Sequence, residues 1–222
     1  MSGIILPLLL IAVIGYLWGS IPSGYWMGKL LRGKDFDIRD YGSKKTGATN
    51  VRRILGNGPA LIVLLVDMSK GIGPALLARY VPLFHGAGWG IAVASFAALL
   101  GHCYPIFIGF RGGRGVITGA GAVLVISPLV FLIAAVIAIT TIAISRYVSL
   151  GSIVGALTMI VCGIVFGILG WVSIPEAVFL VLGPAFVILL HYDNIGRLLA
   201  GKERKLGQKE AIPDNSATTS RA

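Results

Sequence analysis

Three polar segments of this sequence combine glycines, hydroxyl side chains and cations in patterns that suit phosphate. The first, residues 42–53, reads GSKKTGATNVRR. Glycines let backbone N–H groups converge on an anion, hydroxyls donate hydrogen bonds, and arginine offers a planar fork that matches phosphate. The segment predicts an anion-binding loop. The alternative is a solvated loop whose cations simply face a membrane surface.

The second segment, residues 110–115, reads FRGGRG and comes directly before an apolar run. Glycines around Arg111 and Arg114 at the start of a helix predict a phosphate-binding nest. The segment is not a Walker A loop, because it contains no lysine followed by serine or threonine. The alternative is a tight turn whose arginines anchor the chain at the membrane surface.

The third segment follows the last apolar run and contains His191, Asn194, Arg197 and Glu203. His191 and Asn194 are three residues apart, so they share a face if the last helix continues through them. Histidine titrates near neutral pH, which makes His191 a candidate general base. An interfacial histidine without a catalytic role is the alternative.

Asp67 and Lys70 lie inside another apolar run, residues 58–79. A single charge of either kind would cost about 2.5–3.5 kcal/mol at the centre of a membrane helix. Their spacing predicts an ion pair, which lowers that cost. Such a pair can fix the packing of helices or take a direct part in function, and the sequence leaves both open.

Motifs of several other enzyme classes are missing from the sequence. It contains no Gly-x-Ser-x-Gly nucleophile elbow, and no histidine has an aspartate five positions later, as in the His-x4-Asp acyltransferases. Asp35, Asp37 and Asp40 share one loop, and no cluster of Asp, Glu, His and Cys has metal-ligand spacing. The sequence therefore disfavours a metal-dependent phosphotransferase and predicts a membrane site rich in phosphate-binding residues and poor in nucleophiles.

The elements that must position these segments are membrane helices. The 222 residues are 56% hydrophobic and 13% charged, with a mean hydropathy of +0.88, whereas soluble chains carry about 25% charged residues. This composition excludes a disordered chain, a water-soluble enzyme and, despite the net charge of +10, a nucleic-acid-binding protein. Cys103 and Cys162 lie in apolar runs and indicate no disulfide framework.

Apolar runs and basic loops together predict an all-α integral membrane protein. Basic residues concentrate between the first two runs and after the last one, which places both segments in the cytoplasm and the uncharged N-terminus outside. An odd number of crossings joins these two ends. We expect seven, one of them short enough for a half-helix, near residues 4–30, 58–79, 86–110, 115–126, 128–146, 148–170 and 174–191. Residues 1–204 would form one membrane domain, and residues 205–222 a disordered cytoplasmic tail.

The polar motifs resemble those of bacterial acyl-phosphate:glycerol-3-phosphate acyltransferases of the PlsY type. Residues 42–53 are similar to the first motif of that family, residues 101–116 to the second and residues 191–203 to the third. Asp67-x-x-Lys70-Gly71 and Ser149-Leu150-x-Ser152 fit as well. The resemblance covers roughly residues 10–205.

This resemblance implies a multi-pass enzyme of the bacterial inner membrane whose active site faces the cytoplasm. It would transfer an acyl chain from acyl phosphate to the 1-hydroxyl of glycerol 3-phosphate, giving lysophosphatidate and phosphate for phospholipid biosynthesis. Its partners would be these two substrates and membrane lipid, without nucleic acid, metal or cofactor.

Site residues follow from the same resemblance, position by position. Catalytic positions are Ser43, Arg53, Arg114, His191 and Asn194. Phosphate-binding positions are Ser43, Thr49, Asn50, Arg53, Gly112, Gly113, Arg114, Gly115, Ser149 and Ser152, and supporting positions are Asp67, Lys70 and Glu203. The family usually has lysine at positions 111 and 114. Arginine keeps the phosphate contact there but does not readily exchange a proton.

The chemistry of acyl phosphate suits such a site. Acyl phosphate is a mixed anhydride with a good leaving group, so a covalent enzyme nucleophile is unnecessary. Much of the barrier lies in bringing two anions together, where orientation can supply about 7–11 kcal/mol and fixed cations offset the repulsion. Either His191 or a substrate phosphate takes the hydroxyl proton, and the resemblance favours the phosphate.

Two other functions compete with this one. A transporter or channel for an anionic solute would use intramembrane polar groups, for which Asp67 and Lys70 are the candidates. A lipid-anion-binding protein would keep the basic loops but tolerate loss of His191. The motifs gather at a membrane surface and the sequence has no evident internal repeat, and both observations favour the enzyme.

Overall fold

All elements in the described part of the chain, residues 2–85 and 88–208 of a computed structural model, are helices. Five segments are long and apolar enough to cross a membrane: α1 (Ser2–Gly19) with α2 (Ser23–Arg32), α4 (Asn57–Tyr80), α5 (Trp89–Cys103) with the residues that follow it, α7 (Pro128–Ser145) and α8 (Val148–Ile168). α9 (Ile174–Leu189) and α10 (Tyr192–Leu199) add a sixth if the bent pair is one span. α6 (Val116–Ile126) is apolar but shorter.

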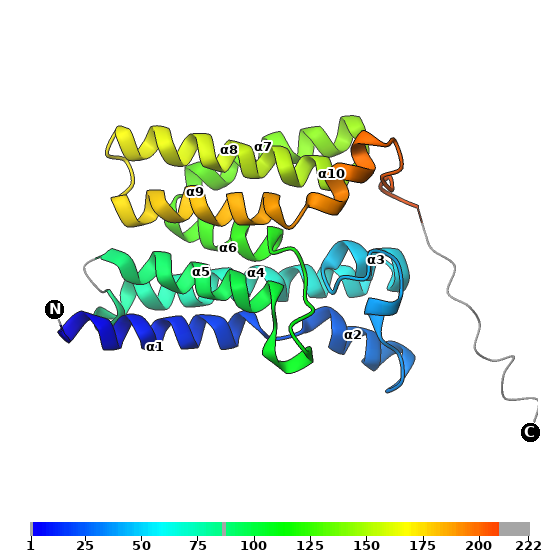
Figure 1. The fold of residues 1–222 in the computed structure, drawn as a ribbon, viewed down its shortest axis with the longest axis horizontal. Coiled ribbons are helices and arrows are strands. Elements are labelled where there is room, and N and C mark those ends of the chain that lie inside the picture. Colours follow the sequence, from blue (N-terminus) through cyan, green and yellow to red (C-terminus); the bar gives the residue numbers. More distant parts are fainter. Residues whose placement is uncertain (1, 86–87, 209–222) are drawn as a thin grey trace, which may run out of the picture.

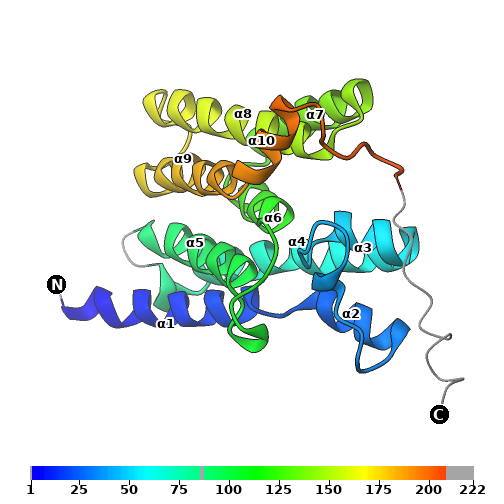
Figure 2. The ribbon, with the colours of Figure 1, turned by 45° about the vertical axis from the view of Figure 1, so that its right-hand side comes forward.

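The long helices lie side by side with their axes roughly parallel (Figure 1). α1 packs on α5, α4 packs on α5 and α6, and α8 packs between α7 and α9. The short helices α2, α3 (Ala48–Leu55) and α10 lie at the same end of the molecule, opposite the start of α1 (Figures 1 and 2). The segments that carry the polar motifs therefore meet at one end of the helix assembly.

Glycines allow the close contacts between these helices. A Cβ atom at Gly19 of α1 would lie 2.1 Å from the carbonyl oxygen of Ala98 in α5. A Cβ atom at Gly71 of α4 would lie 1.9 Å from the carbonyl oxygen of Thr118 in α6. Neither contact is possible for a larger residue, and small residues at helix contacts are typical of membrane proteins.

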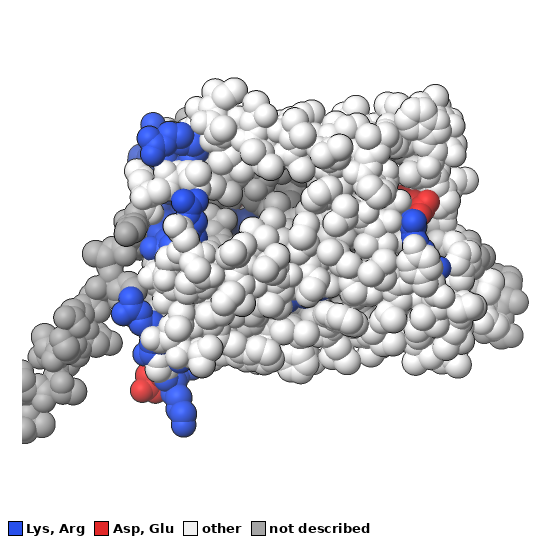
Figure 3. All heavy atoms as spheres, turned by 180° about the vertical axis from the view of Figure 1, so that it is seen from behind, with Lys and Arg blue, Asp and Glu red and all other residues white. Residues whose placement is uncertain are grey.

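Charge and hydrophobicity are distributed as in a multi-pass membrane protein. Lys and Arg gather at one end of the molecule, and a broad belt with very few charged atoms separates them from a small charged group at the other end (Figure 3). Large apolar side chains within the belt face outward, including Leu6 and Ile139, which are 63% and 66% exposed. Hydrocarbon is the solvent in which such a surface is stable.

The first predicted span, residues 4–30, agrees with the segment Gly3–Arg32, which is long and apolar enough to cross a membrane, but it contains a break that was not predicted. Residues 4–30 are not one helix, because the chain breaks between Gly19 and Ser23. Pro22 has no backbone N–H to continue the hydrogen-bond ladder of α1, and a new helix starts directly after it. The amphipathic helix α3 inside the basic loop was not predicted either.

The last predicted span, residues 174–191, corresponds to α9, which ends two residues earlier. α9 stops at Leu189, and the chain turns by 57° into α10. The continuous helix that would place His191 and Asn194 on one face is therefore absent. Polar residues follow the apolar run here, and they start a short amphipathic helix instead of extending the buried one.

The predicted break between residues 126 and 128 is confirmed. α6 ends at Ile126 and α7 begins at Pro128, where proline suits the first turn of a helix. The Ser127 hydroxyl caps α7 by accepting a hydrogen bond from the Val130 N–H. α6 is thus a separate short helix.

The C-terminal segment is described as far as Gln208. The Leu206 N–H donates to the Arg146 carbonyl oxygen at 2.6 Å, and the Lys205 ammonium lies over the ring of Tyr147. Residues 205–208, which we assigned to the tail, thus contact the junction between α7 and α8. The rest of the predicted tail, residues 209–222, lies outside the described residues.

Candidate active site

One cavity of about 630 Å³ brings the three polar segments together. At its polar end it is lined by the residues that the sequence singled out: Ser43, Thr49, Asn50, Arg53, Arg114, Gly115, Ser149, Ser152, His191, Asn194 and Glu203. Lys45 and Arg197 add further positive charge. Gly112, Gly113 and Lys70 are not among the described lining residues. The volume is in the range of small-molecule sites.

Asn50 holds the first polar loop in shape. Its side chain is almost fully buried, and Nδ2 donates to the carbonyl oxygens of Ile38, Tyr41 and Lys45 at 3.3, 3.2 and 2.9 Å. Oδ1 accepts the Ser43 N–H at 2.9 Å. The Asn50 side chain thus binds the backbone of the loop itself. In this way it fixes the position of the loop that carries Ser43 and Arg53.

The second polar loop uses its glycines to approach α5. The Gly112 and Gly113 N–H groups donate to the carbonyl oxygens of Cys103 and His102, both at 3.1 Å. A Cβ atom at Gly113 would lie 2.1 Å from the His102 ring nitrogen Nε2. Because both N–H groups already have acceptors, the phosphate contacts available from this loop are Arg114 and the start of α6.

Arg114 is the cation that this loop presents to the cavity. Its Nε is buried and has no hydrogen-bond partner among the described residues. Burial lowers the pKa of Arg114, and the nearby Arg197 lowers it further, while Glu203 opposes the shift. A guanidinium remains charged under these conditions. A bound anion would supply the hydrogen bonds that the side chain lacks.

Glu203 ties the third polar segment together. Its Oε1 accepts hydrogen bonds from Asn194 Nδ2 at 2.7 Å and Ser149 Oγ at 2.8 Å, and its Oε2 accepts from Arg197 Nε at 2.7 Å. Burial alone would raise the pKa of Glu203, but these three donors lower it below its usual value. The carboxylate joins α8, α10 and the segment after α10.

His191 and Asn194 each keep one polar atom available at the cavity. The His191 Nδ1 lies 2.7 Å from the Val187 carbonyl oxygen. A carbonyl accepts only, so Nδ1 carries the proton of the neutral ring and Nε2 keeps a lone pair. Asn194 Oδ1 is buried without a hydrogen-bond partner in the described residues. A hydroxyl group in the cavity could donate to either atom.

The predicted pair of Asp67 and Lys70 is confirmed, and it belongs to a larger cluster. Lys70 Nζ and Ser23 Oγ both lie 2.6 Å from Asp67 Oδ1, and His102 Nδ1 lies 3.6 Å from it. Thr118 Oγ1 donates to the Asp67 carbonyl oxygen. The cluster joins α2, α4, α5 and α6. Ser23 and Thr118 gave no signal in the sequence, because single hydroxyls are common in apolar helices.

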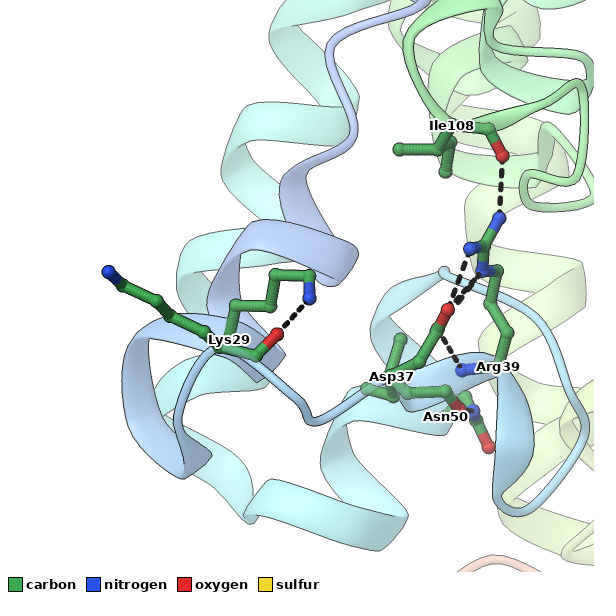
Figure 4. Close-up of polar contacts among 7 residues, drawn as sticks. Lys29, Asp37, Arg39, Asn50 and Ile108 are labelled. Carbon is green, nitrogen blue, oxygen red and sulfur yellow. Dashed lines mark hydrogen bonds and ion pairs between the residues drawn. The ribbon is translucent and has the colours of Figure 1, made fainter.

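Arg39 is a further residue that sequence reasoning missed. Its Nη1 donates to the Ile108 carbonyl oxygen at 2.6 Å, while its Nε and Nη2 donate to the Asp37 carboxylate (Figure 4). The guanidinium also lies over the Tyr25 ring, 4.9 Å from the centroid. The hydrogen bonds that Arg39 donates to the Asp37 carboxylate raise the pKa of Arg39. Arg39 thereby connects the first polar loop to the segment that leads into the second.

Comparison with known proteins gives the family. The family model for glycerol-3-phosphate acyltransferase matches residues 9–201. The chain belongs to this family. The glycerol-3-phosphate acyltransferase of Thermoanaerobacter sp. (strain X514) is 41% identical over 203 residues, which are 91% of this chain and 98% of the relative. That of Thermosynechococcus vestitus is 42% identical over 90% of this chain and 96% of the relative.

The solved structures of PlsY, an integral membrane glycerol 3-phosphate acyltransferase, have the same fold. Its glycerol 3-phosphate form matches with a TM-score of 0.81 and 34% identity, over 90% of this chain and 96% of the other. Its lysophosphatidic acid form matches with a TM-score of 0.78. The present chain is a glycerol-3-phosphate acyltransferase of phospholipid biosynthesis, and the cavity is its candidate active site.

The described residues that line the cavity of this acyltransferase offer no evident place for a metal ion. Among residues 2–85 and 88–208, no group of three His, Cys, Asp or Glu side chains is arranged to hold one. Asp37, which lay in the acidic loop noted in the sequence, is bound to Arg39. The charges that line the cavity are mainly cations.

Proposed function

We propose that this acyltransferase takes its acyl group from acyl phosphate and transfers it to the 1-hydroxyl of glycerol 3-phosphate, with lysophosphatidate and phosphate as products. One observation carries the proposal: a single cavity joins an end rich in phosphate binders to an apolar groove. The two ends suit the two parts of an acyl phosphate. The glycerol 3-phosphate and lysophosphatidic acid forms of the similar PlsY structures support the acceptor and the product.

The reaction then needs orientation more than covalent catalysis. The hydroxyl oxygen forms a bond to the acyl carbonyl carbon, and the bond from that carbon to the phosphate oxygen breaks. Arg53 and Arg114 offset the charge of two phosphates that must lie close together. The leaving phosphate takes the hydroxyl proton, which balances the step without an enzyme base.

His191 orients the attacking hydroxyl in this mechanism. The Val187 carbonyl fixes the ring so that Nε2 can accept a hydrogen bond. Asn194 Oδ1 offers a second acceptor, and Glu203 holds the Asn194 amide in place. Holding reactants in a reactive geometry can contribute about 7–11 kcal/mol.

We further propose seven crossings of the bacterial inner membrane, with the N-terminus outside and the active site facing the cytoplasm. The five long spans, the bent pair of α9 and α10, and the short α6 make up this number. The gathering of Lys and Arg at the end that carries α3 and α10 supports the orientation, because basic loops stay in the cytoplasm (Figures 1 and 3).

Phosphate release by the purified protein tests the proposal. We expect release from acyl phosphate that depends on glycerol 3-phosphate, yields lysophosphatidate and proceeds without added metal or coenzyme A. His191→Ala and Arg114→Ala should each abolish most of the turnover. Leu157→Ala is the control, since that side chain faces outward from α8 and is 49% exposed. Folded protein that releases no phosphate from any acyl phosphate would exclude the donor.

A further inference from the structure

The apolar groove of the cavity ends on four helices at once. α6, α7, α8 and α9 each line one side of the groove. The lining residues farthest from the polar end are Val123 of α6, Phe131 of α7, Met159 of α8 and Phe179 of α9. Closer to the polar end, the groove is lined mostly by the small residues Gly119, Ala120, Ala134, Ala135, Ala138, Gly151, Gly155, Ala156 and Gly183. Small residues keep the groove open, and the four larger ones form its floor.

The floor is part of the rigid interior of the protein. Val123 and Phe179 belong to the main buried core, with 1% and 2% exposure, and Phe131 and Met159 pack against that core. Interiors packed in this way do not yield easily to an added group. The four side chains are therefore a fixed boundary of the groove.

An ion pair beyond the floor holds the closed end together. Arg79 Nη2 at the end of α4 donates to Glu176 Oε1 at the start of α9, at 2.7 Å. The same nitrogen donates to the carbonyl oxygen of Ile126, the last residue of α6, at 3.3 Å. Two of the groove helices, α6 and α9, are thus joined to α4 on the far side of the floor.

The length of the groove follows from the helix rise. Along α8, Met159 lies ten residues beyond Ser149, which corresponds to about 15 Å at about 1.5 Å per residue. Along α9, Phe179 lies ten residues before Leu189, the last residue of that helix. This depth is about that of one bilayer leaflet. With C–C bonds of about 1.5 Å, an extended alkyl chain gains about 1.3 Å per carbon, so about 12 carbons fit.

We infer that Val123, Phe131, Met159 and Phe179 set the acyl-chain length that this enzyme accommodates. The inference rests on the proposed function, in which an acyl chain occupies the groove. For a ligand that is monomeric in water, each methylene added within the groove should strengthen binding about fourfold, because it is removed from water. Once the chain reaches the floor, further methylenes must leave the groove, and the gain in affinity stops.

Two variants move the floor in opposite directions. Met159→Ala deepens the groove, and Ala135→Leu fills it one helical turn above Phe131. Leu157→Ala is the matched control, because Leu157 lies on α8 but faces outward. Two quantities are measured for chains from octanoyl to octadecanoyl: the affinity for 1-acyl-glycerol 3-phosphates and kcat/KM for acyl phosphates.

We expect affinity to rise with chain length and then level off. The chain length at which it levels off should increase in Met159→Ala, decrease in Ala135→Leu and stay unchanged in Leu157→Ala, and kcat/KM should follow the same order. An unchanged break point in folded Met159→Ala and Ala135→Leu overturns the inference, even if every variant is active. If no acyl phosphate reacts while the break point still moves, the donor is wrong and the floor assignment stands.

Discussion

The two ends of the cavity differ in the interactions that shape them, which are hydrogen bonds at the polar end and the packing of small residues in the apolar groove. At the polar end, hydrogen bonds hold the groups in place: Asn50 binds four backbone groups between Ile38 and Lys45, and Glu203 accepts from three side chains. In the apolar groove, small residues leave space that no directed contact defines. The polar end should therefore be sensitive to single atoms, whereas the groove should respond to volume. In the proposed function, the polar end positions the reacting groups and the groove selects the acyl chain.

Replacing Asp67 should have the largest effect, a loss of stability, because Asp67 neutralises the charge of Lys70 inside the helix assembly. In Asp67→Ala, Lys70 remains buried without its carboxylate, and removing one partner of a buried pair costs about 3–5 kcal/mol of stability. Unfolding of the detergent-solubilised protein measures this loss. The double variant Asp67→Asn/Lys70→Met should recover much of it. Equal stability of Asp67→Ala and the wild-type protein would show that the cluster does not hold the four helices together.

Arg114 should give the next largest effect, on activity and not on stability. Arg114→Met removes the cation aimed at the substrate phosphates, and losing one such group typically costs about 10²–10³-fold in kcat. Arg114→Lys keeps the charge and loses only the planar fork, so its kcat should fall much less. Steady-state kinetics with glycerol 3-phosphate and acyl phosphate compare the two. Equal losses in both variants would mean that the fork, rather than the charge, is essential.

Arg39 tests whether the two polar loops must be held together. Arg39→Met removes a charged hydrogen bond to the Ile108 carbonyl, and such bonds contribute about 1.5–3 kcal/mol. We expect kcat to fall about tenfold or more and the KM for glycerol 3-phosphate to rise, with partial recovery in Arg39→Lys. Arg32→Ala, an exposed arginine at the end of α2, is the control. Unchanged kinetics in Arg39→Met would mean that the loops keep their spacing without this contact.

Glu203 should give the smallest effect, and one that depends on pH. Its pKa is lower in the folded protein than in the unfolded chain, so the folded state favours the carboxylate. The resulting stability is fully present above the ordinary pKa of glutamate and is lost as the pH falls through the lowered value. The unfolding midpoint of the wild-type protein should therefore drop in this acidic range. The unfolding midpoint of Glu203→Gln should drop less over the same pH range. Equal drops in the variant and the wild-type protein would exclude Glu203 as the cause.

Much of the fold could be read from the sequence, because the rules that govern it are local. Charge-free runs gave the positions of the spans, and Ser127-Pro128 marked the break between α6 and α7. The break after Gly19 and the bend after Leu189 were missed. Hydropathy does not report such changes of direction, since it measures how apolar a segment is and not where the axis of its helix points.

The sequence alone determined that this chain is a membrane protein, and it predicted three phosphate-binding segments, because composition and motif spacing are properties of the chain itself. Only the tertiary structure decided which polar atoms remain available. The Gly112 and Gly113 N–H groups bind carbonyl oxygens of α5, while Arg114 Nε and Asn194 Oδ1 are left for a ligand. It also decided where the groove ends. Val123, Phe131, Met159 and Phe179 are far apart in the sequence, and they become one floor only when four helices pack together.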